Sequence, residues 1–323
     1  MTIQTTITIP NSNNVQIPII GFGSGTKWQW KKKQGERVYG QELNKFKEIV
    51  DEDLVEATIT ALKHGIVHLD TAEIYTTRKD IGEAIKRSGI SRETLFITDK
   101  YFSRAAGSDG KLRGPYESAK EALELTGLKY LDLFLLHGED QNENYTVESS
   151  WKELERLVDE GLVRAIGVSN HTVKRLQEIA KIARIKPSVN QIEFHPYLQN
   201  QSTGIIEYAE KNDILIEAYG PLTPIVRAKG GPLDSVLDSL AEKYGKTTSQ
   251  ILLKWVHKHG FVTVTTTSNE KRLDEILDVV NFDLDDADFE TITKVGNSHF
   301  FRAFPIPPLP DYDEELKRER GLI

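Results

Sequence analysis

Short apolar runs alternate with longer amphipathic stretches along most of the chain. The runs are IPIIGFG (17–23), IVHLD (66–70), LFITDK (95–100), LDLFLLH (131–137), VRAIGVSN (163–170), PSVNQIE (187–193), DILIEAY (213–219) and FVTVTT (261–266). Strands that are apolar on both faces and alternate with helices are typical of a parallel sheet. Eight such strands predict an α/β fold of the closed (β/α)8 type, a TIM barrel.

The stretches between these runs carry helix signals. One amphipathic stretch starts at Lys79, and another begins near Pro115, a residue suited to the first turn of a helix. The segment SSWKELERLVDEG (149–161) ends in Gly161, which favours a helix C-terminus at that point. VKRLQEIAKIA (173–183) is a further amphipathic stretch. We therefore expect a helix or a long loop after each strand.

Three segments lie outside this alternation. TITIPNSNNVQIP (6–18) predicts a small β-hairpin before the barrel, with NSNN as its turn. Residues 28–47 form an inserted loop between the first strand and its helix. The tail from Asn297 predicts a C-terminal substrate loop over the barrel, although its PPLP run (307–310) could instead bind a proline-recognition module. No linker interrupts the chain, so residues 1–323 are expected to form a single domain.

Composition narrows the possible functions. The net charge is −8, from 41 basic and 49 acidic residues, which disfavours nucleic acid and anionic membranes as partners. An anionic ligand would need a local basic pocket. No apolar run approaches the ~20 residues of a membrane-spanning helix, and the N-terminus lacks the features of a signal peptide. The chain has no cysteine, so disulfides and thiolate metal sites are excluded. We expect a cytoplasmic protein without a metal.

Polar residues end the predicted strands. In a barrel of this kind the active site lies at the C-terminal ends of the strands. The strand-end residues are Asp70, Lys100, His137, Ser169, Asn170, Gln191, Tyr219 and Thr266. Taken alone, each has an ordinary structural explanation, such as a turn cap for Asp70 or a core position for His137. Their convergence on one rim favours a functional site.

Asp70, Tyr75, Lys100 and His137 together suit the reduction of a carbonyl group. A tyrosine hydroxyl has a pKa near 10, and a nearby ammonium lowers it. Asp70 would keep Lys100 charged and in place, and a neutral His137 would orient the substrate carbonyl. None of the four is an obvious attacking group, so the attacker is inferred to be a hydride from a cofactor.

Other residues on the rim suit a nicotinamide. Ser169, Asn170 and Gln191 offer amide and hydroxyl groups for a carboxamide, and the ring of Tyr219 offers a stacking surface. Lys271 and Arg272 could contact an adenosine phosphate. GFGSGT (21–26) resembles a dinucleotide fingerprint, but Thr26 replaces the third glycine and no helix follows directly. We interpret it as a loop close to the cofactor pyrophosphate.

Over nearly its whole length the sequence resembles the aldo-keto reductase superfamily. The segments HLDTAEIY, ITDKY, LLHG, IGVSN, VNQIEFHPY, AYGPL and RLDE occur in the family's order. More narrowly, the chain resembles the yeast and fungal branch of conjugated polyketone (ketopantoyl lactone) and α-keto amide reductases. The resemblance implies that Tyr75 is the general acid, that Lys100 and Asp70 tune it, and that His137 orients the carbonyl. It also implies NADPH as the cofactor.

The resemblance further implies two sets of binding residues. The cofactor set is Gly25, Thr26, Asp70, Ser169, Asn170, Gln191, Tyr219, Gly220, Pro221, Leu222, Thr266, Thr267, Ser268, Arg272 and Glu275. The substrate set is Trp28, Trp30, Tyr101, His137, Gly138, His299 and Phe300. Two departures stand out: Gly138, Glu139 and Asp140 follow the active-site histidine, and Thr266 occupies the position of a common phosphate-binding lysine.

Three hypotheses follow. The first is an NADPH-dependent reductase of activated ketones or aldehydes: α-dicarbonyls, keto lactones, α-keto esters or α-keto amides. The second is an aldolase with Lys100 as a Schiff-base nucleophile, which the neighbouring Asp70 disfavours. The third is a weakly catalytic or non-catalytic, NADPH-binding interaction subunit on the same barrel. For the first, the expected partner is a small carbonyl compound, and the expected state is a monomer or weak dimer.

Overall fold

Parallel strands form the centre of the fold. The computed structural model describes residues 4–107, 109–139 and 142–323. Within these ranges eight strands close into a barrel in the order β10-β3-β4-β5-β6-β7-β8-β9. They are β3 (Ile20–Gly23), β4 (His68–Asp70), β5 (Phe96–Tyr101), β6 (Leu131–Leu136), β7 (Val163–Ser169), β8 (Val189–Glu193), β9 (Leu215–Tyr219) and β10 (Val262–Thr265). The predicted barrel is confirmed, and each strand lies within its predicted apolar run apart from Tyr101.

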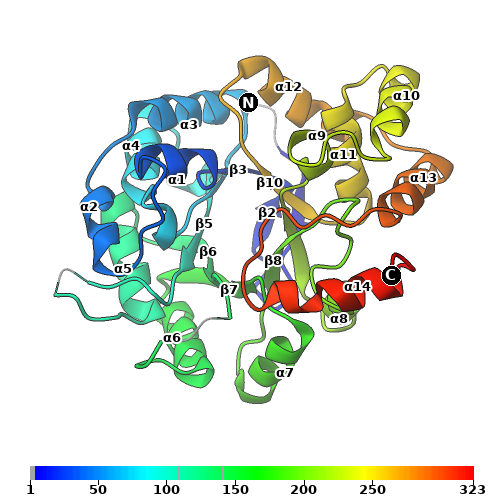
Figure 1. Cartoon of the computed structure of the whole chain (residues 1–323). Coiled ribbons are helices and arrows are strands. Elements are labelled where there is room, and N and C mark those ends of the chain that lie inside the picture. The colour runs from blue at the N-terminus through cyan, green and yellow to red at the C-terminus, as the bar shows by residue number, and fades with distance from the viewer. Residues whose placement is uncertain (1–3, 108, 140–141) are drawn as a thin grey trace.

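Helices surround the barrel (Figure 1). They are α3 (Glu52–His64), α4 (Arg78–Ser88), α5 (Pro115–Thr126), α6 (Val147–Asp159), α7 (Val173–Ile182), α8 (Ile205–Lys211), α10 (Asp234–Tyr244), α11 (Thr248–Lys258), α12 (Glu270–Leu277) and α13 (Asp286–Asn297). Short elements between them are α9 (Thr223–Val226), η2 (Glu73–Tyr75), η3 (Arg92–Thr94) and η4 (Asp278–Asn281). As predicted, α5 begins at Pro115, and Gly161 follows α6 with a φ of 71°.

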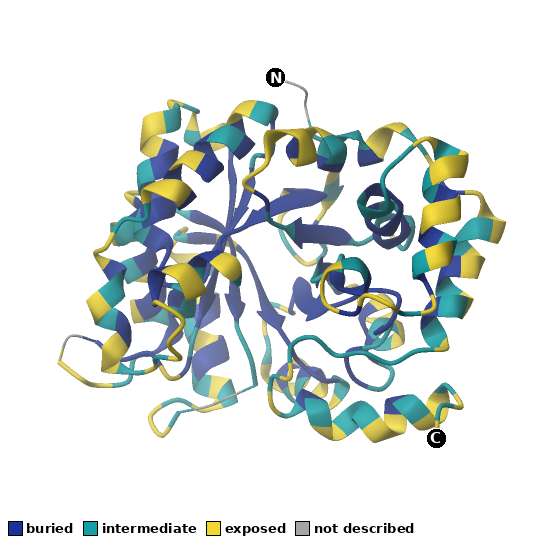
Figure 2. Cartoon of the chain, turned by 45° about the horizontal axis from the view of Figure 1, so that its top comes forward, coloured by how far each residue is buried: buried dark blue, intermediate teal, exposed yellow. Residues whose placement is uncertain are grey.

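The core lies between the strands and the inner faces of the helices (Figure 2). It includes the fully buried Phe134 of β6, Trp151 of α6 and Trp255 of α11. Burial of large aromatic side chains contributes much of the apolar area that stabilises such a core. None of the helices built from the described residues is both long enough and apolar enough to cross a membrane.

A hairpin covers one end of the barrel. Its strands, β1 (Thr6–Thr8) and β2 (Gln16–Pro18), pair antiparallel with Thr6 opposite Pro18. Its apolar side chains Ile9 and Ile17 are buried in one cluster with barrel residues from β5, β6, β7, β8 and β10. The predicted first strand (17–23) is therefore divided, because its first two residues pair within the hairpin and only Ile20 onward joins the barrel.

The inserted segment is helical rather than an irregular loop, which corrects the sequence-based expectation. It contains α1 (Lys27–Lys32), η1 (Gln41–Leu43) and α2 (Asn44–Lys47). Buried ion pairs attach it to the outer helices. Lys32 pairs with Asp80 of α4, and Lys47 lies 2.9 Å from Glu121 of α5. These pairs hold α1 beside the C-terminal ends of the strands.

The C-terminal tail crosses the barrel mouth and ends in η5 (Leu309–Tyr312) and α14 (Asp313–Glu319). The buried carboxylate of Glu193, at the end of β8, accepts hydrogen bonds from the backbone N–H groups of Ala303 (2.7 Å) and Phe304 (3.1 Å). Leu309 of the PPLP run is fully buried. This run is therefore part of the fold and does not present a free proline-rich ligand.

Candidate active site

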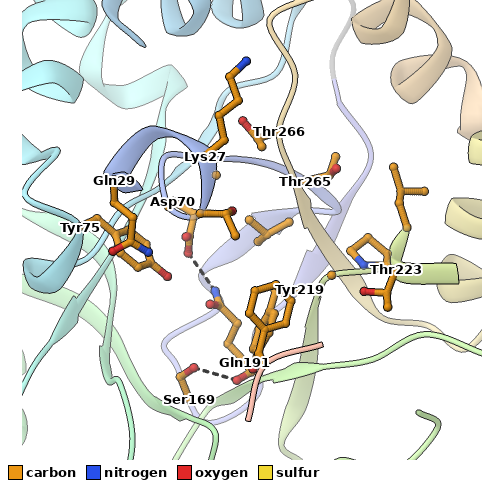
Figure 3. A pocket seen from close by; sticks show the side chains of 18 of the residues that line it. Lys27, Gln29, Asp70, Tyr75, Ser169, Gln191, Tyr219, Thr223, Thr265 and Thr266 are labelled. Atoms are coloured by element: carbon orange, nitrogen blue, oxygen red, sulfur yellow. Dashed lines mark hydrogen bonds between the residues drawn. The ribbon is translucent and has the colours of Figure 1, made fainter. Parts of the chain in front are cut away.

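A cavity of about 550 Å³ lies at the C-terminal ends of the strands. Figure 3 shows its polar side chains converging from several strands. The predicted residues that line it are Gly25, Thr26, Trp30, Asp70, Tyr75, His137, Ser169, Asn170, Gln191, Tyr219, Gly220, Pro221, Leu222 and Thr266. The folded chain thus brings most of the predicted site residues together.

Lys100 and Asp70 form a buried pair beneath this cavity. The Lys100 ammonium donates to both carboxylate oxygens of Asp70 at 2.7 Å and to the Thr71 carbonyl oxygen at 3.0 Å. Burial alone would lower the pKa of Lys100, but the charge of Asp70, the nearby Tyr75 and the hydrogen bonds to Asp70 together outweigh it, and the pKa is raised. A lysine that stays protonated is a poor nucleophile, so the aldolase hypothesis is not supported.

Tyr75 and His137 face each other at the cavity wall. Tyr75 ends η2, and its hydroxyl oxygen lies 3.4 Å from Nε2 of His137, which follows β6. The two rings meet edge to face, with centroids 5.4 Å apart. The Tyr75 ring packs so closely on Gly25 that an added Cβ there would lie 2.9 Å from two ring carbons. A glycine at this position lets the ring lie flat against the loop.

The pKa of Tyr75 differs from the sequence-based expectation, whereas His137 is neutral as expected. Burial raises the pKa of Tyr75 above its usual value of 10, and the opposing charge of Lys100 does not reverse this. Burial, reinforced by the charges of Lys100 and Lys33, lowers the pKa of His137 well below 6.5. At neutral pH the phenol therefore keeps its proton and the imidazole is neutral. The prediction of a lowered tyrosine pKa is therefore wrong.

A hydrogen-bonded network forms the other wall. Gln191 donates both amide hydrogens, at 2.8 Å each, to Oδ2 of Asp70 and to Oε2 of the buried Glu217. Its side-chain oxygen, Oε1, accepts no hydrogen bond from a described residue, and Gln191 lines the cavity. Ser169 donates to the Gln191 backbone carbonyl at 2.8 Å. A carboxamide N–H2 group would find two acceptors here, Oε1 of Gln191 and Oγ of Ser169.

Asn170 and Tyr219 are already engaged with each other. Asn170 donates to the His137 carbonyl oxygen and to Oγ of Ser169, each at 3.0 Å. Its own carbonyl oxygen accepts from the Tyr219 hydroxyl at 2.7 Å and from Gln201 at 2.9 Å. All of its polar atoms are used, so in this structure Asn170 positions its neighbours around the cavity.

A second cavity of about 600 Å³ opens on the other side of His137. The linings of both cavities include Trp30, Ile74, His137 and Phe304, so the two cavities adjoin at the imidazole. The second one also contains Lys33 of the region after α1 and the predicted substrate residue Gly138. Glu139 faces α7 instead, where it accepts from the Thr172 backbone at 2.6 Å. Asp140 lies outside the described residues.

Four predicted substrate residues do not line either cavity. The indole N–H of Trp28 donates to Thr266 Oγ1 at 2.9 Å within the core. Tyr101 is buried and donates to the Arg113 carbonyl oxygen at 2.8 Å. His299 packs against Tyr197, and Phe300 lies beneath Lys317. The expectation fails for His299 and Phe300 because the tail reaches the cavity only from Ala303 onward.

The outermost cofactor residues continue away from the cavity. Thr267 and the exposed Ser268 follow Thr266 in the loop before α12, and Ser268 accepts from the Lys27 ammonium at 2.9 Å. Arg272 is exposed on α12, and Glu275 is half-buried there. These four residues lie in the loop before α12 and on α12 itself, and they do not line the cavity.

The sequence-based analysis missed several cavity residues. They are Lys27 and Gln29 of α1, Ile74, Thr223 and Val226 of α9, Arg227, Phe304 and Ile306. It also missed the fully buried Glu217, whose pKa is raised to about 8 by burial and by the charge of Asp70. A signal for Glu217 was present, because a carboxylate interrupts the apolar run DILIEAY two residues before Tyr219 and so shares its face of the strand.

The sequence as a whole is similar to known reductases. A model described as the Aldo/keto reductase family matches residues 28–297. An NADPH-dependent alpha-keto amide reductase of Saccharomyces cerevisiae is 37% identical over 305 residues, which covers 92% of each chain. An NAD/NADP-dependent indole-3-acetaldehyde reductase of Schizosaccharomyces pombe is 34% identical and covers 90% of this chain and 95% of that protein.

Solved structures show the same similarity. An aldo/keto reductase from Brucella melitensis is 30% identical with a TM-score of 0.72, covering 90% of this chain and 99% of that one. The Bombyx mori aldo-keto reductase in complex with NADP is 25% identical with a TM-score of 0.78, covering 97% and 98%. The matches therefore extend across the barrel and its strand ends.

Proposed function

The chain belongs to the Aldo/keto reductase family, and on that premise we propose that it is an NADPH-dependent carbonyl reductase with Tyr75 as proton donor. The observation that carries the proposal is the 3.4 Å separation of the Tyr75 hydroxyl and His137 Nε2 on one cavity wall. A substrate carbonyl oxygen placed between them can accept a hydrogen bond from each. The carbonyl is then fixed and polarised by two neutral donors.

The described residues fit a nicotinamide cofactor. Oε1 of Gln191 and Oγ of Ser169 can accept the two hydrogens of its carboxamide, and Tyr219 lines the same cavity. When bound, NADPH supplies a hydride to the carbonyl carbon. Tyr75 supplies the proton that completes the alcohol. The positive charge of Lys100, fixed by Asp70, favours the phenolate that remains.

The substrates that we propose are activated ketones or aldehydes: α-dicarbonyls, keto lactones, α-keto esters or α-keto amides. Support comes from the alpha-keto amide reductase of Saccharomyces cerevisiae among the relatives. Coenzyme preference rests on Thr267, Ser268 and Arg272, since Thr266 stands where a lysine is common. A cytoplasmic location, a single domain and a monomeric or weakly dimeric state also remain predictions.

The test is a panel of carbonyl compounds, including ketopantoyl lactone and isatin, with NADPH and with NADH. Turnover is followed as loss of absorbance at the reduced-nicotinamide band. Tyr75→Phe keeps the ring packed on Gly25 but removes the proton donor, so turnover should be abolished while cofactor binding is retained. Failure of the wild-type protein to reduce any activated carbonyl would refute the function, and an active Tyr75→Phe variant would refute the role of Tyr75.

A further inference from the structure

Lys33 differs from the other buried lysines of the described chain. Lys32, Lys33, Lys47 and Lys100 are all at least nine-tenths buried. Lys32, Lys47 and Lys100 each form an ion pair with a carboxylate. Among the described residues, Lys33 has no such partner. A buried charge without a counter-charge is energetically unfavourable, so this exception calls for an explanation.

The hydrogen-bond partners of Lys33 are neutral. Its ammonium donates to the Ile74 carbonyl oxygen and, at 3.2 Å, to Oε1 of Gln29. Burial, together with the nearby charge of Lys32, lowers its pKa to about 8. A lysine ammonium has three N–H donors, so one donor remains beyond these two contacts. The bond to Ile74 places this ammonium beside the backbone of the residue that precedes the proposed proton donor, Tyr75.

Lys33 lines the second cavity together with His137. The lining of that cavity also includes Arg37 and Arg227, with Glu36 as the only acid among its described residues. This excess of cations stands out in a chain whose net charge is −8. A local basic lining of this kind attracts and orients an anion within an otherwise acidic protein.

On the basis of the proposed function, we propose that Lys33 binds the carboxylate of a 2-oxo acid, whose neighbouring ketone is reduced at Tyr75 and His137. The ligand then supplies the counter-charge that the protein lacks. A carboxylate attached directly to the reacting carbon suits an ammonium that lines the same cavity as His137. A neutral ester or amide at the same place keeps one hydrogen bond but loses the ion pair.

The experiment compares benzoylformate with ethyl benzoylformate, which share the ring and the reacting ketone. We expect Lys33→Gln to lower kcat/KM for benzoylformate by about tenfold to a hundredfold, the range of a lost charged hydrogen bond. Activity on the ester should stay within a few fold of wild type. Glutamine can still donate to the Ile74 carbonyl, so this variant removes the charge but keeps the contact that holds the turn. Lys33→Arg, which keeps the charge, should restore much of the selectivity.

Lys31→Gln is the matched control, because Lys31 lies on α1 but pairs with Asp51 and Asp53 outside both cavities. It should leave the ratio of the two substrates unchanged. An equal loss on both substrates in Lys33→Gln would make Lys33 a support for Ile74 alone and overturn the proposal. A raised KM for NADPH with an unchanged substrate ratio would assign Lys33 to the cofactor and overturn it too. Absence of all turnover in the wild-type protein would instead refute the proposed function itself.

Discussion

The Lys100 ammonium lies 2.7 Å from both carboxylate oxygens of Asp70. One of these oxygens also accepts from the Gln191 amide at 2.8 Å. A single carboxylate therefore holds both the cation next to the phenol of Tyr75 and the side-chain amide of Gln191 on the opposite cavity wall. Lys100 and Gln191 are therefore both positioned by the Asp70 carboxylate. A substitution that moves either side chain is expected to shift the other through Asp70.

Removal of only one member of this pair should destabilise the protein. Lys100→Met leaves the Asp70 charge buried without its partner, which costs about 3–5 kcal/mol. The double variant Asp70→Asn/Lys100→Met removes both charges and should recover most of that loss in urea unfolding. Neither variant should regain turnover, since the cation beside Tyr75 is absent in both. A double variant no more stable than Lys100→Met alone would contradict this view of the pair.

Gly25→Ala should impair catalysis through the Tyr75 ring. The added methyl would lie 2.9 Å from two ring carbons, so the ring must move away from the loop. A displacement of about 1 Å in a reacting group can cost about a hundredfold in rate. We expect kcat to fall by at least about tenfold in steady-state assays, with the fold retained by circular dichroism. Wild-type kcat in Gly25→Ala would show that the ring position is not critical.

The strand-end residues could be predicted because each is the polar residue at the end of an apolar run. Parallel strands in a barrel bring their C-terminal ends to one face, so order along the chain was enough to place Asp70, His137 and Gln191. The hydrogen-bond partners of these residues and their pKa values could not be predicted in this way. The pKa of Tyr75 depends on burial as much as on Lys100, and a sequence does not give the balance of the two.

The contributions of the tail and of the inserted segment could not be predicted in the same way. Phe304 reaches the cavity because its backbone binds Glu193 across a separation of 111 residues, and no local pattern indicates such a contact. Residues 28–47 have no regular alternation of apolar positions, and buried ion pairs with the outer helices hold the segment in place. The position of Lys33 in the second cavity follows from those tertiary contacts.

Glu193→Gln should loosen the tail over the barrel mouth. The carboxylate accepts hydrogen bonds from two backbone N–H groups. In a glutamine, the amide N–H2 group would face one of these N–H groups and could not accept from it. Loss of a charged hydrogen bond costs about 1.5–3 kcal/mol. We expect faster tryptic cleavage within residues 298–320 and a KM for substrate raised several-fold. Glu315→Gln, the same change at an exposed position of α14, should leave both unaltered. Equal cleavage of the two variants would contradict the anchoring role of Glu193.

The buried His68 should contribute a loss of stability in acid. Burial lowers the pKa of His68 to about 3, whereas in an unfolded chain it is near 6.5. Between about pH 6.5 and pH 3, His68 is therefore protonated in the unfolded state but not in the folded state. The contribution of His68 to stability falls as the pH decreases from about 6.5 toward 3, by about 1.4 kcal/mol per pH unit once well below 6.5. At pH 5 the contribution of His68 to this loss is about 2 kcal/mol.

His68→Asn isolates this contribution. The variant should be less stable at pH 7, because it loses the contacts of the ring with Phe96 and Thr98. Its free energy of unfolding should nevertheless fall less steeply than that of the wild type between pH 6.5 and 5. Glu217, 3.5 Å from His68, keeps its proton throughout this range because its pKa is about 8. In the unfolded chain the Glu217 carboxyl is ionised over most of this range, so Glu217 stabilises both proteins toward acid and opposes the His68 contribution to the same extent in each. The difference between the two urea-derived slopes therefore reports on His68. Parallel slopes would mean that His68 is protonated in the folded state as readily as in the unfolded one.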